Sequence, residues 1–481
     1  MILPMSPADS MFLLGESREH PMHVGGLALF DPPEGGDARD MRVLLDSAFA
    51  GGKVSPLLRK RARRTLSSLG QWGWESDVEV DLGHHIRHNA LPQPGGLGEL
   101  LDLVSRLHAH LLDRNRPLWE MHLIEGLADG RFAVYMKIHH SLTDGVSAMR
   151  LLRSALSEDA GRRGMPALWE PVLGERAPAA VETAVDAGGV NLLELPGAVL
   201  RGVRGAVGLL PALATTVDNA WNNRGGALSL AAPPSILNAP IGGARRCAAR
   251  SWPIERLRLV AKAADATVND VVLAMCSGAL RSYMDEVGAL PVEPLVALVP
   301  VSLRGGGPGG KTGNEFGVLS CNLATDLEDP AERLDSVRTT MSEGKEAMSA
   351  RSQGEVLAMS ALGAVPLVLG VLLGDRAPIR PPNVMISNVP GPREPLYWNG
   401  ARLAALYPLS IAIDGQALNI TCTSTDDEIA FGLTGCRRSV PPLAPLLDYL
   451  DEELGALEVS VGLMAPASAA GEAVSEPDSV H

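Results

Sequence analysis

Apolar and polar positions alternate along this chain in patterns that predict strands and helices in turn. Residues 132–138 form a short apolar run with β-branched and aromatic members, which is typical of a buried strand. Between residues 146 and 156 the apolar positions recur at helical spacing, so we expect a helix there. Residues 139–145 would then form a loop that joins the end of a strand to the start of a helix.

The second half of the chain repeats this alternation. Residues 295–301 and 384–387 predict strands, and residues 271–284 predict a helix. Thr267 and Asp270, three residues apart, have the spacing of a cap at the start of that helix. A chain of 481 residues also exceeds one ordinary core, so we predict an α/β or α+β fold in two lobes.

The region between the two halves differs in composition. Residues 158–241 are rich in Pro, Gly and Ala around an apolar stretch at 192–213, which predicts a long linker with an amphipathic helical segment. Residues 461–481 have the composition of a disordered tail. We therefore divide the chain into an N-terminal lobe (1–157), a linker (158–241), a C-terminal lobe (242–460) and a tail (461–481).

One uncharged run, residues 356–374, is long enough to span a bilayer. A fully buried helix of a large protein gives the same pattern, and Pro366 interrupts this one. We favour a buried helix or helix pair. Insertion into a membrane surface and a true span are the alternatives.

Composition narrows the classes of function. Hydrophobic residues make up 46% and charged residues 20%, as in globular proteins, and a net charge of −14 argues against general nucleic-acid binding. A local basic cluster interrupts this acidic chain. It consists of Arg59, Lys60, Arg61, Arg63 and Arg64. We interpret it as a solvated helix face, with contact to anionic lipid or to the phosphates of CoA as the alternative.

Cysteine usage and the N-terminus indicate a compartment. The five cysteines are odd in number and none has CxxC spacing, which favours neither a disulfide framework nor a zinc site. The first residues lack a basic start followed by a long apolar stretch, so we expect no signal peptide. A reducing, cytoplasmic location follows as an expectation.

The heptapeptide HHSLTDG, residues 139–145, carries the strongest chemical signal. Acyl transfer to an alcohol needs a base for the hydroxyl proton and then an acid for the leaving group, and imidazole suits both steps. Asp144 can cap the following helix or pair with an arginine, and Gly145 would allow a sharp turn. The alternative is a chance histidine pair beside a capping aspartate. The second pair, His84 and His85, lacks the Asp-Gly and is interpreted as surface or core histidine.

HHSLTDG resembles the HHxxxDG motif of the bacterial wax ester synthase/diacylglycerol acyltransferase family, which belongs with the chloramphenicol acetyltransferase-like enzymes. Further segments are similar to blocks of this family, in the same order, from about residue 5 to 457. They are MSPADSMFLL and PMHVGGLALF near the start, Pro117-Leu118-Trp119, the segment with Asn269 and Asp270, VPVSLR (299–304), GNEFG (313–317) and SNVPGP (387–392).

The resemblance implies a fold and roles for single residues. It implies two chloramphenicol acetyltransferase-like lobes, each a mixed sheet flanked by helices, with a reaction chamber between them. His140 would be the catalytic base and Asp144 structural. His139 would shape the channel or orient its neighbour, or act directly. Asn269 and Asp270 would cap a helix or line the site. Trp119 is expected in the core.

The implied activity is transfer of a long-chain acyl group from acyl-CoA to diacylglycerol, giving triacylglycerol, with long-chain alcohols as other acceptors. Acyl-CoA would be the co-substrate, and we expect no metal and no further cofactor. Because these substrates are lipids, the resemblance also favours peripheral association with the inner face of the membrane or with lipid droplets.

Two other functions remain as alternatives, and one formal motif match is set aside. The acyl donor could be bound to a carrier protein, or the chain could be a lipid-surface binding protein without catalysis, although the intact HHxxxDG argues against the latter. GGGPGGKT, residues 305–312, formally matches a phosphate-binding P-loop. Strand-like residues rather than a helix follow it, so we interpret it as a glycine-rich loop.

Overall fold

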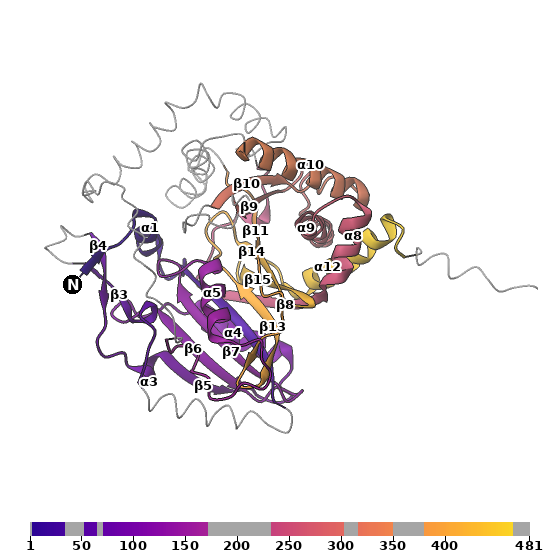
Figure 1. Ribbon diagram of the computed structural model, residues 1–481. Helices are drawn as coiled ribbons and strands as arrows, with labels where there is room; N and C mark the ends of the chain where they lie inside the picture. The colour runs from indigo at the N-terminus through magenta and orange to yellow at the C-terminus, as the bar shows by residue number, and fades with distance from the viewer. Residues whose placement is uncertain are drawn as a thin grey trace, which may run out of the picture.

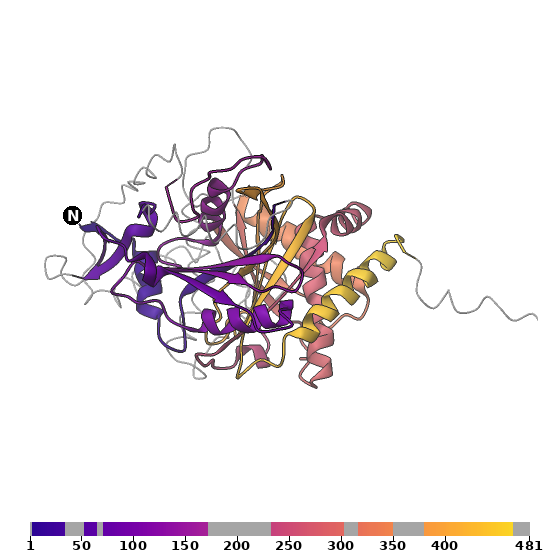
Figure 2. The same ribbon diagram turned by 90° about the horizontal axis from the view of Figure 1, so that it is seen from below.

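Two six-stranded mixed sheets dominate the structure, a computed structural model that describes residues 2–33, 52–64, 71–171, 232–302, 316–349 and 380–464. Figure 1 shows the N-terminal half of the chain (indigo to magenta) beside the C-terminal half (pink to yellow). Figure 2 shows the same two lobes from below. The arrangement agrees with the predicted α/β fold in two lobes.

The sheet of the first lobe has the strand order β12-β13-β2-β7-β6-β5, in which only β5 and β6 are parallel neighbours. Its strands are β2 (His23–Asp31), β5 (Ile86–Ala90), β6 (Trp119–Glu125), β7 (Phe132–His139), β12 (Tyr397–Trp398) and β13 (Ala401–Leu409). Its helices are α3 (Leu82–His85), α4 (Leu97–Ala109) and α5 (Gly145–Ala155). The first lobe thus takes two strands, β12 and β13, from the C-terminal half. The boundaries 1–157 and 242–460 therefore do not assign each sheet to one segment of the chain.

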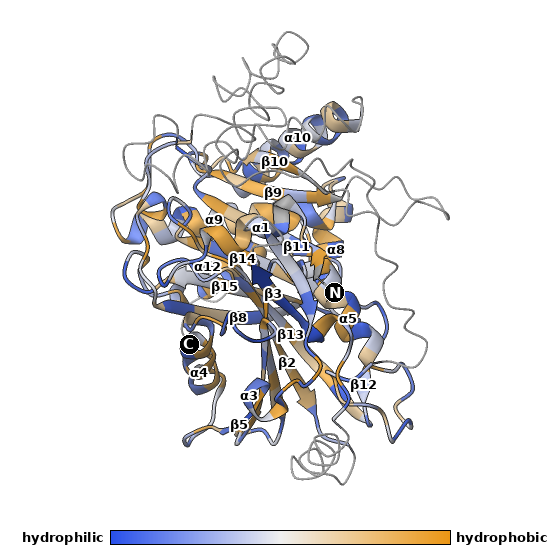
Figure 3. Ribbon diagram, turned by 90° about the vertical axis from the view of Figure 1, so that its left-hand side faces the viewer, coloured by the Kyte–Doolittle hydropathy of each residue, from blue (hydrophilic) through white to orange (hydrophobic). Residues whose placement is uncertain are grey.

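A small sheet with the order β1-β4-β3 lies at the edge of this lobe. Its strands are β1 (Ile2–Pro4), β3 (Lys60–Arg64) and β4 (Trp72–Ser76), and the short helices beside it are α1 (Pro7–Gly15) and η1 (Leu57–Arg59). The basic cluster lies mainly on β3, which is blue in Figure 3, so its prediction as a helix face is wrong. Strand alternation places Arg61 and Arg63 on one side of the sheet, where both contact Glu75 of β4 at 2.7 and 2.9 Å.

The sheet of the second lobe has the order β10-β9-β11-β14-β15-β8, in which β11 runs parallel to β9 and β14. Its strands are β8 (Arg245–Pro253), β9 (Val296–Ser302), β10 (Phe316–Asn322), β11 (Val384–Val389), β14 (Leu418–Ser424) and β15 (Glu428–Cys436). The accompanying helices are η4 (Ile236–Asn238), α8 (Ile254–Ala263), α9 (Val268–Glu286), α10 (Pro330–Ser349) and α12 (Ala444–Ser460). Strands β9 and β11 confirm the predicted strands at 295–301 and 384–387.

Helix α9 forms the centre of the second lobe's core, and α10 and α12 pack against it. Its residues 271–280 are buried throughout, which explains an apolar and small-residue sequence without a polar face. The predicted cap is present: Asp270 Oδ2 accepts a hydrogen bond from the Thr267 backbone at 2.9 Å, and Thr267 Oγ1 accepts one from the Asp270 backbone at 3.2 Å.

Several predicted segments fall outside the described residues. They are the apolar stretch at 192–213, the uncharged run at 356–374, the glycine-rich loop at 305–312 and all of the tail beyond residue 464. Within the part of the chain that is described, every helix is too short or too polar to cross a bilayer.

Candidate active site

The HHxxxDG loop joins β7 to α5, as the hydrophobic pattern predicts, and both neighbouring strands of β7 hold its start. The backbone N–H of His139 donates to the carbonyl of Leu118 at 3.0 Å, and that of His140 donates to the carbonyl of Met22 at 2.8 Å. The Leu142 N–H then closes a turn onto the His139 carbonyl at 2.9 Å. The histidine pair is therefore fixed to the sheet through its backbone on both sides.

His139 is completely buried and both of its ring nitrogens face polar groups. Its Nδ1 accepts a hydrogen bond from the Ser141 backbone N–H at 3.1 Å and lies 2.6 Å from the Ser141 hydroxyl. Because an N–H donor occupies Nδ1, a neutral His139 carries its proton on Nε2. That Nε2 lies 3.3 Å from Oε1 of Glu16.

His140 presents a different environment. Its side chain is half-buried, and its ring stacks on Phe12 of α1 with the ring centres 4.2 Å apart. Burial lowers the pKa of His140 below its ordinary value, while a hydrogen bond to its own backbone and the charge of Asp144 oppose this shift. His140 is thus a neutral imidazole at pH 7, the form that can accept a proton.

Asp144 and Gly145 form the start of α5. The Asp144 carboxylate accepts a hydrogen bond from the Ser147 backbone N–H at 2.7 Å, which is the predicted capping interaction. Gly145 has helical backbone geometry rather than the positive φ of a sharp turn, so the expectation of a turn at this glycine is wrong. A Cβ built on Gly145 would lie 3.7 Å from Val389, which ends β11 of the second lobe.

Asn269 and Asp270 separate into different roles. The Asn269 side chain accepts a hydrogen bond at 3.4 Å from Asn388, the neighbour of Val389, and so faces the side of the second lobe that meets the HHxxxDG loop. Asp270 is buried and caps α9, as described above. Capping is thus confirmed for Asp270, whereas a role of Asn269 in lining the site stays a prediction.

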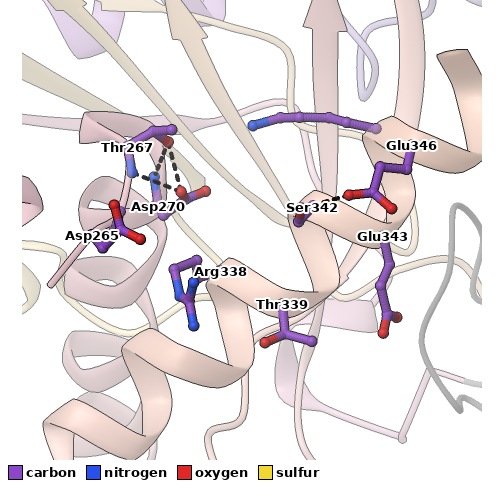
Figure 4. Close-up of a pocket in the computed structure, with 10 residues that line it drawn as sticks. Asp265, Thr267, Asp270, Arg338, Thr339, Ser342, Glu343 and Glu346 are labelled. Carbon is purple, nitrogen blue, oxygen red and sulfur yellow. Dashed lines mark hydrogen bonds between the residues drawn. The ribbon is translucent and has the colours of Figure 1, made fainter.

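Asp270 also lines an open surface pocket of about 500 Å³ between the start of α9 and helix α10. Figure 4 shows Asp265, Thr267 and Asp270 on one side and Arg338, Thr339, Ser342, Glu343 and Glu346 on the other. The lining mixes acidic and basic side chains, and neither His139 nor His140 belongs to it.

Three residues at the site are absent from the sequence prediction: Phe12, Glu16 and Arg114. The guanidinium Nε of Arg114 lies 2.8 Å from Oε2 of Glu16, the carboxylate that approaches His139. Phe12 lies in the opening segment that resembles the family and Glu16 two residues after it, but nothing in the local pattern indicates what they contact. Only the packing of α1 against the loop reveals these contacts.

The remaining histidine and tryptophan predictions agree with the structure. His85 is buried, with Nδ1 2.7 Å from the carbonyl of Trp119 and its ring stacked on the indole. His84 lies on the surface side of the same short helix. Trp119 is a core residue whose indole N–H donates to the carbonyl of Leu58 at 2.7 Å.

Comparisons with known proteins agree with this geometry. The sequence profile of the wax ester synthase/diacylglycerol acyltransferase catalytic domain matches residues 5–272, and that of the WS/DGAT C-terminal domain matches residues 312–458. A Mycobacterium tuberculosis protein named as a candidate diacylglycerol O-acyltransferase, Rv0895, is 53% identical over 96% of this chain and 92% of its own length. A second M. tuberculosis protein of this kind, tgs2, is 46% identical over 95% of this chain and 99% of its own.

Solved structures extend the comparison to the fold. The wax ester synthase/diacylglycerol acyltransferase from Marinobacter aquaeolei VT8 is 40% identical, with a TM-score of 0.76 over 95% of this chain and 100% of that one. The first condensation domain of the calcium-dependent antibiotic synthetase is 20% identical, with a TM-score of 0.54 over 96% and 97% of the two chains. At that identity the likeness concerns the two-lobed fold alone.

Proposed function

Because the chain belongs to the wax ester synthase/diacylglycerol acyltransferase family, we propose that it transfers a long-chain acyl group from acyl-CoA to diacylglycerol, forming triacylglycerol. Long-chain alcohols are alternative acceptors, which would give wax esters. Acyl-CoA serves as co-substrate, and no metal or other cofactor takes part. The observation that carries the proposal is a neutral, half-buried His140 on a loop that is held by the residues before β2 and β6 of the first lobe and lies close to Val389 of β11 in the second.

The chemistry assigned to His140 is general base and then general acid catalysis. The imidazole accepts the hydroxyl proton of diacylglycerol while the alcohol oxygen attacks the thioester carbonyl. The carbon–sulfur bond of the tetrahedral intermediate then breaks, and the protonated imidazole returns the proton to the CoA thiolate. The products are triacylglycerol and free CoA. Asp144 supports this step by holding the start of α5 in place.

The proposal is tested by His140→Ala, assayed with a long-chain acyl-CoA and dioleoylglycerol, with lipid products separated by chromatography. We expect the rate to fall by about 100- to 10,000-fold, the usual contribution of a general base. His84→Ala is the matched control and should retain activity, because the half-buried His84 ring packs on His85 in α3. Wild-type activity in a folded His140→Ala protein would end this assignment.

The same assay identifies the donor and the acceptor. Acyl-CoA and acyl-carrier protein are compared at equal concentration, and dioleoylglycerol is compared with hexadecanol. We expect acyl-CoA to be the better donor and diacylglycerol the better acceptor. A clear preference for the acyl-carrier protein would replace the proposed donor.

We further propose that the protein attaches peripherally to the inner face of the membrane or to lipid droplets, since diacylglycerol does not readily leave a lipid phase. Supporting features are Arg63 and Arg64, which are exposed on β3, and the apolar stretches at 192–213 and 356–374. Attachment through the basic cluster should weaken as salt rises, whereas attachment through apolar segments should persist until detergent is added. The proposal is contradicted if the protein stays in the soluble fraction and does not bind anionic liposomes at any salt concentration.

A further inference from the structure

Glu16 is a charged residue in an unusual place, directly after α1 and with only 1% of its side chain exposed. Burying a carboxylate is costly unless its oxygens are paired. Here Oε2 contacts Arg114 at 2.8 Å and Oε1 approaches His139 Nε2 at 3.3 Å. This approach is a close ion-pair contact and not a well-aligned hydrogen bond, and neither Oε1 nor that Nε2 has a hydrogen-bond partner within the described residues. Burial by itself would raise the pKa of Glu16, but His139 and Arg114 outweigh it and lower the pKa.

These contacts determine the state of His139. The Ser141 N–H requires Nδ1 to be an acceptor, and the nearby negative charge of Glu16 favours the proton on Nε2. One tautomer and one ring orientation satisfy both neighbours. The His139 carbonyl is also held by the Leu142 N–H. The ring and the backbone of the residue directly before His140 are therefore fixed together.

Helix α1 contacts both histidines of the pair. Phe12 and Glu16 are four residues apart, the spacing that places side chains on one side of a helix. Phe12 stacks on His140 while Glu16 pairs with His139. Arg114 fixes the end of this helix, because its Nη2 donates to the carbonyls of Leu13 at 2.9 Å and Glu16 at 3.2 Å.

From this arrangement we infer that Glu16 is a positioning residue for acyl transfer, which acts on His140 through His139. The carboxylate orients the His139 ring, and the fixed His139 sets where the His140 ring lies against Phe12. Glu16 itself touches neither His140 nor the reacting atoms. The inference rests on the proposed role of His140 as the base, and it adds a residue 123 positions before His139 along the chain.

Two substitutions test this inference, and each removes one partner of the contact between Glu16 and His139. Glu16→Gln keeps the size of the side chain, but one amide cannot accept from Arg114 and from His139 at the same time. His139→Asn keeps an acceptor for the Ser141 N–H and loses the group that faces Glu16. Because His139→Asn leaves the Glu16–Arg114 pair intact, it also serves if Glu16→Gln fails to fold. Glu19→Gln, an exposed carboxylate three residues further on, is the matched control.

Kinetics separate positioning from general stability. We expect each variant to lower kcat by about 10- to 100-fold, as a small error in the placement of a catalytic group does, with the KM for acyl-CoA nearly unchanged. In the double variant the loss should equal that of one single variant, because both break the same contact. Glu19→Gln should match the wild type.

Two results would overturn the inference. One is wild-type kcat in folded Glu16→Gln or His139→Asn; the other is a double variant whose losses multiply, which would mean that the two residues act independently. These outcomes are distinct from failure of the proposed function. If His140→Ala is inactive while Glu16→Gln is fully active, only the positioning role fails; if His140→Ala is active, the assignment of the base fails first.

Discussion

A buried histidine that packs against β7 predicts how the stability of this protein depends on pH. His108 of α4 accepts a hydrogen bond on Nδ1 from the Tyr135 hydroxyl at 2.8 Å and donates from Nε2 to the carbonyl of Ser410 at 3.3 Å. Burial lowers the pKa of His108 to about 3, the charges of Lys137 and Arg245 act in the same direction, and the bond to Ser410 opposes them. The folded protein thus keeps this ring neutral.

The magnitude follows from the difference between the two states. In the unfolded chain the ring titrates near its ordinary value of 6.5, so below that pH only the unfolded state gains the proton. The stabilisation from this histidine is complete above pH 6.5 and is lost as the pH falls toward 3. The contribution of His108 to the free energy of unfolding falls by about 1.3 kcal/mol between pH 7 and 5.5, and by about 2.5 kcal/mol between pH 7 and 4.5.

The measurement is the free energy of unfolding from urea titrations at several pH values between 7 and 4.5. His108→Gln should be less stable than the wild type at pH 7, because the packing is altered, but should lose about 2.5 kcal/mol less on acidification. His110→Gln, two residues away with an exposed side chain, is the control and should leave the slope unchanged. Parallel pH curves for His108→Gln and the wild type would refute the reasoning.

Three further predictions concern the active-site loop and the core. Asp144→Ala should weaken the start of α5 by about 1 kcal/mol, whereas the amide of Asp144→Asn still accepts the Ser147 N–H and should keep more of the kcat. An equal and total loss of kcat in both variants would favour a proton-transfer role for Asp144. Because the pKa of His140 is below 6.5, kcat/KM should stay level down to about that pH and fall only at lower pH, and a fall centred above 6.5 contradicts this. Because the Asp144 charge raises this pKa, Asp144→Asn should move the fall to a lower pH, and an unmoved fall contradicts that. Gly278→Ala would push a methyl group into the buried Glu453 carboxylate that pairs with Arg333, and the free energy of unfolding measured with heat or urea should fall by about 3 kcal/mol. Gly455→Ala is the control: the site has open space around it, so this change should raise the free energy of unfolding by about 0.5 to 1 kcal/mol.

The sequence alone determined the local framework of the site. The apolar run that ends at His139, the spacing of the following helix and the capping residue Asp144 place the HHxxxDG loop between β7 and α5. The pair Thr267 and Asp270 likewise identifies the start of α9. These features are recognisable because a strand, a helix and a cap each depend on residues within a few positions of one another.

Only the tertiary structure decided which distant segments complete the site. β13 pairs with β2 although more than 370 residues separate them, and Asn388 of β11 reaches Asn269 at the start of helix α9. Glu16 lies beside His139 because α1 packs against the loop, and the basic cluster is a strand because β4 offers it a partner with Glu75. A local pattern specifies neither the partner of a strand nor the neighbour of a buried charge. Those choices depend on burying apolar surface and pairing buried polar groups over the whole fold at once.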